Sequence, residues 1–349
     1  MFRLLVIGLI MGSALRAPGA DPAPAAAQPA REKPPHARVV VVRNAAAMDS
    51  FNPQSGPVAA MVKQGLLHLT GQTGLTEAWG RLIAPQDTVG IKVHASPGAT
   101  GGTRPAVVAA LVQSLLDAGH AASRIVIWDK HLADLRRAGF VELGRQFEVR
   151  VAGSADEGYD PKVFYDTAPV GQLVWGDHEF GQRGEGIGRK SYVSRLVSQE
   201  ITKIVSVTPL LNSYQSGVAG NLYSLALGSV DNTLRFEKDW DRLVEAIPEI
   251  VALPEVGDRV VLGVVDALIC QYEGEQSSLL HYSTRLNQLR FSTDPVALDV
   301  LSLQELEAQR PSAVAGPARD YMTLYRNATM LELGVSEARA IRVETLSNE

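Results

Sequence analysis

Short runs of β-branched residues alternate along this chain with segments of helical periodicity, and this alternation restricts the fold more than any other feature. The clearest example runs from a strand candidate at 88–94, through a helical stretch at 104–118, to a second strand candidate at 124–129. A strand–helix–strand unit of this length is typical of a parallel pair joined by a right-handed crossover. The sequence therefore predicts an α/β fold, a mostly parallel or mixed sheet flanked by helices in Rossmann-like layers.

The same alternation continues on both sides of this unit. Further strands are expected at 38–43, 147–151, 203–208, 259–269 and 289–292, and further helices at 58–69, 75–82, 191–197, 240–250 and 295–309. Pro209 is expected to follow the end of its strand, Thr103 to cap the helix at 104–118, and Asp294 to cap the helix at 295–309. The segment 152–188 has no clear period, which indicates a long excursion with a hairpin near 173–180.

The N-terminus reads as a targeting signal rather than as part of the fold. Arg3 precedes an apolar run from Leu4 to Leu15, and the small residues Ala17 and Gly19 fit a cleavage site. This run is shorter than the roughly 20 residues that span a bilayer as a helix. We predict a signal peptide at 1–19, a flexible Ala/Pro-rich linker at 20–37 and a single domain at 38–345, hence an exported protein, periplasmic or secreted, with no membrane span after cleavage. An uncleaved anchor is the alternative.

Charge and cysteine content exclude several classes of function. The net charge is −5, and the chain has no concentrated Lys/Arg segment, so nucleic acid is not expected as a partner. Cys270 is the only cysteine in the sequence, which rules out an intramolecular disulfide and an iron–sulfur cluster of the chain's own. Because Cys270 lies in the apolar run 260–270, we expect a buried structural thiol.

A glycine-rich loop at 95–103 is the first candidate site. It joins a strand to a helix, where free backbone N–H groups and the positive end of a helix can hold an anion. The small anionic ligand expected there would contact Lys92, Gly98, Gly101, Gly102, Thr103, Arg104 and Asn221. A connecting loop that uses glycine only for tight turns is the alternative.

Histidines and acids near the predicted strand ends form the second candidate site. His94, Asp129 and His131 would meet if the strands are parallel, and they could then bind a divalent metal. Lys92, Asp129 and Asp266 are the candidates for acid–base or other catalytic roles. Asp266 needs a partner or a site because its strand is so apolar. The alternative for each histidine is an ordinary hydrogen-bonded imidazole without a ligand.

Seven segments in order along the chain carry a resemblance to a known family. They are VGIKVHASPGATGGTRP (89–105), VVAALVQSLLDAGH (107–120), IVIWD (125–129), ITKIVSVTPLLNSY (201–214), VAGNLYSLALG (218–228), VVLGVVDALI (260–269) and FSTDPVALDVLSL (291–303). In this order they resemble the domain of unknown function 362 family. The resemblance implies an α/β fold, and some members carry appended iron–sulfur modules, but it implies no particular activity.

This chain departs from the family pattern at two places. Many relatives have Lys-x-His after one strand and Lys-Asn further on, where this sequence has Leu210-Leu-Asn212 and Gly220-Asn221. It also has no CxxC module. Our leading hypothesis is an exported protein that binds a small anionic ligand or a divalent metal at the carboxyl ends of the strands, with catalysis left open. The alternative is a non-catalytic accessory or ligand-binding protein of a periplasmic redox or metal pathway.

Overall fold

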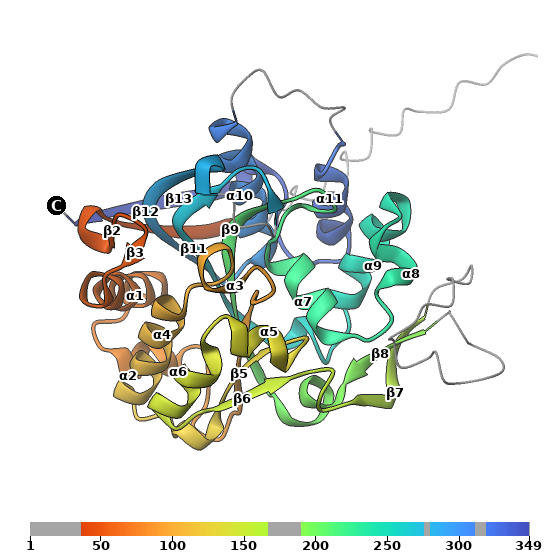
Figure 1. Ribbon diagram of the computed structural model, residues 1–349, viewed down its shortest axis with the longest axis horizontal. Helices are drawn as coiled ribbons and strands as arrows, with labels where there is room; N and C mark the ends of the chain where they lie inside the picture. The colour runs from red at the N-terminus through yellow and green to blue at the C-terminus, as the bar shows by residue number, and fades with distance from the viewer. Residues whose placement is uncertain (1–35, 167–189, 276–279, 311–318, 349) are drawn as a thin grey trace, which may run out of the picture. The chain divides into compact units, whose positions relative to one another are not determined.

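Nine strands form a central sheet, and their bounds are β1 (Ala37–Asn44), β4 (Val89–Val93), β5 (Ile125–Asp129), β6 (Arg150–Gly153), β9 (Lys203–Ser213), β10 (Gly217–Val218), β11 (Val260–Gln271), β12 (Ser283–Ser292) and β13 (Ile341–Asn348). The strand order is β13–β1–β12–β11–β9–β4–β5–β6, with β10 paired to β9 beside this path (Figure 1). Neighbouring strands are parallel except at β12 and β10. The predicted α/β fold with a mixed, mostly parallel sheet is confirmed.

The computed structural model describes residues 36–166, 190–275, 280–310 and 319–348, which belong to one compact unit, Pro35–Glu349. The predicted signal peptide, nearly all of the predicted linker and the predicted hairpin at 173–180 lie outside the described residues. In the described part of the chain, no helix combines the length and apolar character that a membrane crossing requires.

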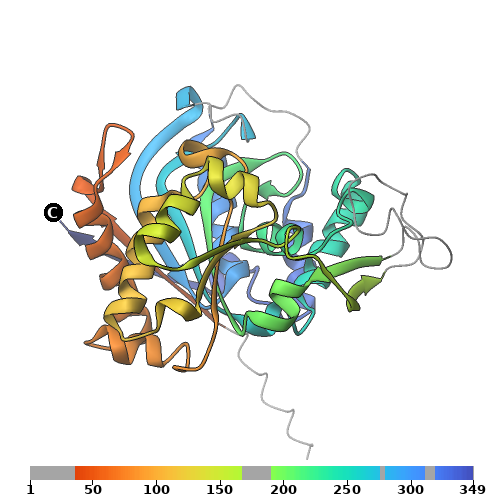
Figure 2. The same cartoon turned by 60° about the horizontal axis from the view of Figure 1, so that its bottom comes forward.

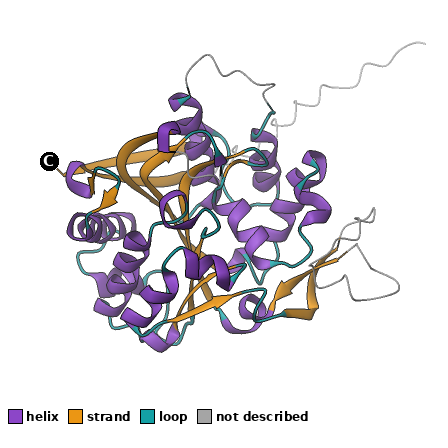
Figure 3. Cartoon of the chain, viewed as in Figure 1, coloured by secondary structure: helices purple, strands orange, loops and turns teal. Residues whose placement is uncertain are grey.

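Helices cover both faces of the sheet, as Figures 1 and 3 show. One face packs against α1 (Ser55–Thr70), α2 (Leu75–Gly80), α4 (Pro105–Asp117) and α6 (Phe140–Phe147). The other face packs against α7 (Asn221–Ser229), α8 (Leu234–Glu237), α9 (Trp240–Val251), α10 (Pro295–Gln309) and α11 (Met322–Met330). The alternation of side chains along a strand explains the two layers. In β1, Val39 and Val41 enter one core while Val40 and Val42 enter the other.

Smaller elements complete the fold at the edges of the two layers. Strands β7 (Tyr159–Asp166) and β8 (Lys190–Ser194) form an antiparallel pair at the lower right of Figure 1, and Figure 2 shows the same pair from another direction. Strands β2 (Met48–Asp49) and β3 (Asn52–Pro53) form a second small pair. The short helices α3 (Gly98–Gly101) and α5 (Leu132–Arg137) follow β4 and β5.

The structure corrects the prediction that a strand ends before Pro209. Strand β9 continues through Pro209 to Ser213. On one side its partner β4 has already ended opposite Val207, and on the other side β11 has a register shift between Asp266 and Cys270. A residue without an N–H is tolerated there because neither neighbour continues a regular ladder past it.

Other boundaries also differ from the prediction. The prediction of a helix at 191–197 is wrong. Strand β8 occupies the first half of this range, and a π-helical turn, Leu196–Glu200, follows it. Helix α6 extends to Phe147, so the strand expected at 147–151 begins only at Arg150. The strand expected at 289–292 is the end of the longer β12. Helix α10 has the predicted bounds, and Asp294 Oδ1 accepts from the Ala297 N–H at 2.8 Å, as the capping prediction requires.

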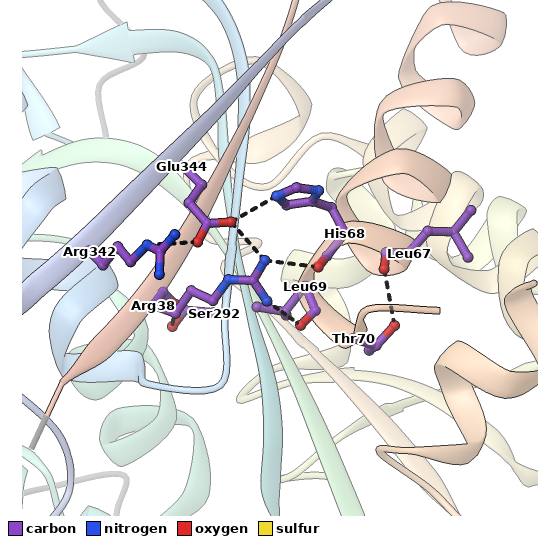
Figure 4. A network of polar contacts seen from close by, with 8 residues as sticks. All are labelled: Arg38, Leu67, His68, Leu69, Thr70, Ser292, Arg342 and Glu344. Atoms are coloured by element: carbon purple, nitrogen blue, oxygen red, sulfur yellow. Dashed lines mark hydrogen bonds and ion pairs between the residues drawn. The ribbon is translucent and has the colours of Figure 1, made fainter. Parts of the chain in front are cut away.

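Strand β13 is held at the edge of the sheet by a polar network, drawn in Figure 4. Arg38 of β1 donates to Glu344 of β13 at 2.7 Å and also to the carbonyl oxygens of His68 and Leu69 at the end of α1. His68 Nε2 lies 2.8 Å from the same Glu344 carboxylate. The hydrogen bonds from Arg38 and His68 lower the pKa of Glu344 to about 2. The Glu344 carboxylate thus links the edge strand β13 to its neighbour β1 and to helix α1.

Candidate functional site

A pocket lies at the carboxyl ends of β4 and β5, beside α7. Its volume is about 130 Å³, and its walls are formed by Lys92, His94, Ser96, Asp129, Lys130, His131, Asp134, Tyr223, Ser224, Leu227, Gly228 and Glu237. Because β4 and β5 are parallel neighbours, their carboxyl ends lie at one edge, where ligands of open α/β sheets bind. The structure therefore brings together four predicted residues, Lys92, His94, Asp129 and His131.

Lys92 and Asp129 form a buried ion pair at the base of this pocket. Lys92 Nζ lies 2.8 Å from Asp129 Oδ1, and it also donates to the Val93 carbonyl oxygen at 2.7 Å and to Ser224 Oγ at 2.9 Å. These three acceptors match the three hydrogens of an ammonium group, so we assign Lys92 as charged. Burial lowers the pKa of Lys92, and Asp129 opposes that effect. The ammonium is thus fixed in place, with its hydrogens already donated to the protein.

Asp129 connects the carboxyl ends of β4 and β5 through its two oxygens. Oδ1 accepts from Lys92 Nζ and from the Lys130 N–H at 2.8 Å, and Oδ2 accepts from the Ala95 N–H at 2.7 Å. Burial pushes the pKa of Asp129 upward, but Lys92 and these hydrogen bonds outweigh it and hold that pKa below its usual value. Asp129 is therefore a charged residue that positions the loops after β4 and β5.

His94 follows β4 and has only 8% of its surface exposed. Burial, helped by Lys92 and opposed by Asp129, lowers the pKa of His94 to about 4, so the imidazole is neutral at neutral pH. Its ring forms no hydrogen bond with any described residue, whereas its backbone N–H donates to Thr103 Oγ1 and its carbonyl oxygen accepts from the Thr103 N–H. A neutral imidazole has one donor and one acceptor, and both are normally paired when the residue is buried. Neither ring nitrogen of His94 is among the fully enclosed atoms that lack a partner, so the ring opens into the pocket and can bond with a molecule there.

The outer wall of the pocket comes from residues that the sequence analysis did not single out. Lys130 Nζ donates to the Asp231 carbonyl oxygen at 2.8 Å and lies 3.3 Å from Thr233 Oγ1. Thr233 Oγ1 in turn donates to Glu237 at 3.3 Å, and Tyr223 Oη donates to the other oxygen of Glu237 at 3.3 Å. His131 is exposed at the rim. No local motif marks Tyr223 or Glu237, because they reach the pocket only through the packing of α7 and α8.

The glycine-rich loop and Arg104 form a separate buried group around Asp266. Asp266 Oδ2 accepts from the Arg104 N–H at 3.0 Å, and Asp266 Oδ1 lies 3.0 Å from the Arg104 guanidinium. The carboxylate thus lies at the N-terminus of α4, where an anionic ligand was expected. Asp266 has the partner that its apolar strand requires. Lys92 lines the pocket, whereas Gly98, Gly101, Gly102, Thr103 and Arg104 do not belong to the wall described above.

Thr103 does not cap α4 as expected. Its hydroxyl accepts from the His94 N–H at 2.9 Å and donates to the Val207 carbonyl oxygen at 2.7 Å, which ties the loop to two strands. Gly102 is needed because a Cβ atom there would lie 2.5 Å from the His94 carbonyl oxygen. At Gly102 the loop therefore needs glycine for close packing against the end of β4, and at Gly98 the positive φ of 79° favours glycine; anion binding by this loop stays a prediction.

Asn221 likewise contacts a protein carboxylate. Asp299 of α10 accepts from the backbone N–H groups of Asn221 and Leu222 at 2.7 and 2.9 Å, and from the Asn221 side-chain amide at 2.9 Å. Burial raises the pKa of Asp299 to about 6, against these hydrogen bonds. Asp299 thus supplies the negative charge at the N-terminus of α7, and Asn221 does not belong to the pocket wall described above.

In the described residues, His94, Asp129 and His131 do not form an arrangement that could hold a metal ion. Within residues 36–348, outside the undescribed gaps, no group of three or more His, Cys, Asp or Glu side chains is placed to hold a metal ion. The Asp129 carboxylate already pairs with the Lys92 ammonium, whose positive charge disfavours a second cation beside it. The metal site stays a prediction, and the donors present do not favour it.

Comparisons with known proteins identify no family for this chain. Neither the protein-family models nor the curated proteins contain a match to this sequence. Among solved structures, a crystal structure of a Thermotoga maritima protein from a structural genomics consortium is similar, with 11% sequence identity and a TM-score of 0.41. The alignment covers 75% of this chain and 60% of that one, so this chain spans less than two thirds of that protein's length. A likeness of this degree says nothing about activity.

Proposed function

We propose that this protein binds a small molecule carrying an anionic group in the pocket at the ends of β4 and β5. The observation that carries the proposal is His94, a buried neutral imidazole that lines the pocket and forms no hydrogen bond with the described residues. A carboxylate or phosphate oxygen would accept from its ring N–H. The Lys92 ammonium lines the same pocket but is already paired with Asp129, so the ring N–H of His94 is the donor on which the proposal depends.

Binding, rather than catalysis by Lys92, is the role that these contacts favour. A lysine that acts as a nucleophile or base needs a neutral, accessible amine. Lys92 instead donates to three protein acceptors and is 1% exposed. His94 with a pKa near 4 is a weak base at neutral pH. The alternative of a non-catalytic ligand-binding or accessory protein is therefore the form of the hypothesis that we pursue.

Two parts of this proposal rest on the sequence alone. The predicted signal peptide at 1–19 supports an exported, periplasmic or secreted protein. The seven segments quoted above support a divergent relative of the domain of unknown function 362 family, in which case an accessory role in a periplasmic redox or metal pathway is the natural setting. N-terminal sequencing of the mature protein tests the first part, since cleavage before Ala20 is expected.

Calorimetric titration with acetate and with inorganic phosphate tests the binding proposal. We expect at least one of the two anions to bind the wild-type protein, and His94→Phe to weaken that binding at least tenfold, because the ring donor is lost. His281→Phe is the matched control, since His281 is exposed and does not line the pocket. Equal binding by the His94→Phe variant, or no binding of any anionic probe by wild type, contradicts the proposal.

A further inference from the structure

Strand β13 forms one outer edge of the central sheet, next to β1 (Figure 1). It pairs with β1 from Ile341 to Asn348 without a register shift, and among the described residues no strand pairs with its other side. Its sequence, IRVETLSN, has no proline and no lysine, two residues that commonly protect a sheet edge from other chains. The opposite edge strand, β6, has only four residues. Strand β13 thus presents a long, regular row of backbone N–H and C=O groups.

Two charges of opposite sign lie on the α1 face of β13. Arg342 and Glu344 are two residues apart and share this face, where Glu344 also contacts His68 of α1, as Figure 4 shows. Arg342 Nε lies 3.0 Å from Glu344 Oε1, and the Arg342 side chain is 77% exposed. A guanidinium has five N–H donors, and the described contacts of Arg342 use one of them. Arg342 therefore has donors left for a second carboxylate.

Glu344 has an acceptor site left as well. Its Oε2 accepts from Arg38 and from His68, whereas its Oε1 has only the described contact with Arg342. A carboxylate offers about four lone-pair sites, so Oε1 can accept from another guanidinium.

The other face of β13 carries an uncovered apolar side chain at the strand centre. Val343 has 46% of its surface exposed, whereas Ile341 on the same face is buried in the core. Thr345, the next residue on this face, is also exposed. β-Branched residues are stabilised in a sheet by contact with a cross-strand neighbour. Val343 and Thr345 therefore suit a strand that has a neighbour on its outer side.

We propose that β13 pairs with β13 of a second copy of this chain, antiparallel and about a two-fold axis at Val343. Residues directly opposite each other in an antiparallel pair share a face. In this register Arg342 of each copy lies opposite Glu344 of the other, and the two Val343 side chains meet on the other face. The interface is isologous, so each favourable contact occurs twice.

The charges on β13 select this register over its neighbours. With the axis at Glu344, two carboxylates would lie opposite each other, and with the axis at Arg342, two guanidinium groups would do so. With the axis between Val343 and Glu344, Val343 would lie opposite a carboxylate. Like charges directly opposite each other destabilise a strand pair. Only the axis at Val343 pairs both charges and both valines.

Sedimentation equilibrium of the full mature protein over a wide range of concentration tests the proposal. We expect a dimer, and we expect Val343→Lys to raise its dissociation constant at least tenfold, because two ammonium groups would then lie opposite each other at the axis. Leu234→Lys is the matched control. Leu234 is 40% exposed on α8, away from the sheet edge, and its replacement should leave the dissociation constant unchanged.

Disulfide cross-linking tests the register itself, because Cys270 is the only native cysteine and is buried. In Val343→Cys the two introduced thiols would meet at the axis, so mild oxidation should give a covalent dimer. Thr345→Cys is the matched control on the same face. Its two copies would lie roughly 14 Å apart along the strands, at about 3.4 Å per residue, and a disulfide joins Cα atoms within about 7 Å of each other.

Three results would overturn the proposal. The first is the mass of one chain at every concentration. The second is a dimer that Val343→Lys leaves intact, and the third is cross-linking of Thr345→Cys as readily as Val343→Cys, since these would mean another surface or register. The midpoint of thermal unfolding shows whether Val343→Lys is folded; if it is not, the cross-linking comparison decides. None of these results bears on ligand binding at the ends of β4 and β5.

Discussion

Gly228 of α7 lies directly against the side chain of Lys92, and a Cβ atom on Gly228 would come within 2.2 Å of Lys92 Cε and 3.0 Å of its Nζ. Lys92 cannot easily move away, because its ammonium is bound to Asp129, Ser224 and the Val93 carbonyl oxygen. The absence of a side chain at Gly228 therefore sets the separation between α7 and β4. The shape of the pocket depends on that separation.

Gly228→Ala should destabilise the protein by about 1–3 kcal/mol, the usual cost of overpacking a core, and should weaken ligand binding. Urea denaturation measures the first effect, and titration with acetate or inorganic phosphate measures the second. Gly56→Ala is the control, since a Cβ there meets nothing within 4 Å, and it should be neutral or stabilising by up to about 1 kcal/mol. An unchanged unfolding free energy for Gly228→Ala would show that α7 is free to shift.

Lys92→Met should destabilise the protein by about 3–5 kcal/mol. The change leaves the Asp129 carboxylate buried without its counter-ion, which costs more than the net contribution of the pair itself. The free energy of unfolding in urea measures the effect. Lys63→Met, on the exposed face of α1, is the matched control and should change that free energy by less than about 0.5 kcal/mol. If Lys92→Met changes the free energy of unfolding as little as Lys63→Met does, water must hydrate the Asp129 carboxylate in the folded variant.

Two buried groups should give opposite pH dependences of stability. The pKa of His94 in the folded protein is about 4, below its ordinary value of 6.5, so the unfolded chain binds the proton more readily between these values. Stability from His94 is full above about pH 6.5 and falls by about 3 kcal/mol as the pH drops to 4. The pKa of Asp299 in the folded protein is about 6, above its ordinary value of 3.8, so its contribution to stability falls by about 3 kcal/mol as the pH rises from 3.8 to 6.

Single variants separate the two contributions. Measured by urea denaturation from pH 4 to pH 7, the stability of His94→Gln relative to wild type should increase toward acid, and that of Asp299→Asn should increase toward neutral pH. Nuclear magnetic resonance titration of the His94 ring gives an independent value, and a midpoint near 6.5 in the folded protein would refute the lowered pKa of His94.

Cys270 should not react with a thiol reagent in the native protein. It is buried in β11, and burial raises the pKa of its thiol to about 12, so both access and thiolate are lacking. An absorbance assay with an aromatic disulfide reagent should show no release in buffer and one thiol per chain in denaturant. Rapid labelling without denaturant would show that the β11 region opens locally.

The parts of the fold that the sequence predicted are those that local signals determine. The β-branched run of β1 and the proline and aspartate at the start of α10 act through neighbouring residues, and both elements formed as expected. The meeting of Lys92, His94, Asp129 and His131 was also predictable, because it needs only parallel β4 and β5. Pro209 misled the prediction, because its tolerance depends on where β4 and β11 lose their regular pairing.

The prediction of an anion site at the glycine-rich loop used only the local sequence, which does not show the distant residues that reach this loop. A strand followed by glycines and a helix does present N–H groups, but Asp266, 162 residues away from Arg104, already accepts one of them. Asp299 does the same at α7, 78 residues from Asn221. Sequence spacing cannot show that the protein supplies its own anion at a helix end. The same limit hid Glu237 and Tyr223, which reach the pocket through tertiary packing.

Strand β1 is synthesised early, but the strands that pair with it are synthesised late. Its partners β12 and β13 come from the last part of the described chain, and Arg38 and Glu344, which join β1 to β13, are 306 residues apart. Until those partners are synthesised, the run Val39–Val42 has neither neighbour, and unpaired β-branched strands are prone to intermolecular pairing. During synthesis there is therefore a long period in which the unpaired β1 can pair with other chains. Binding of a chaperone, or dilution, would favour folding over aggregation in this period.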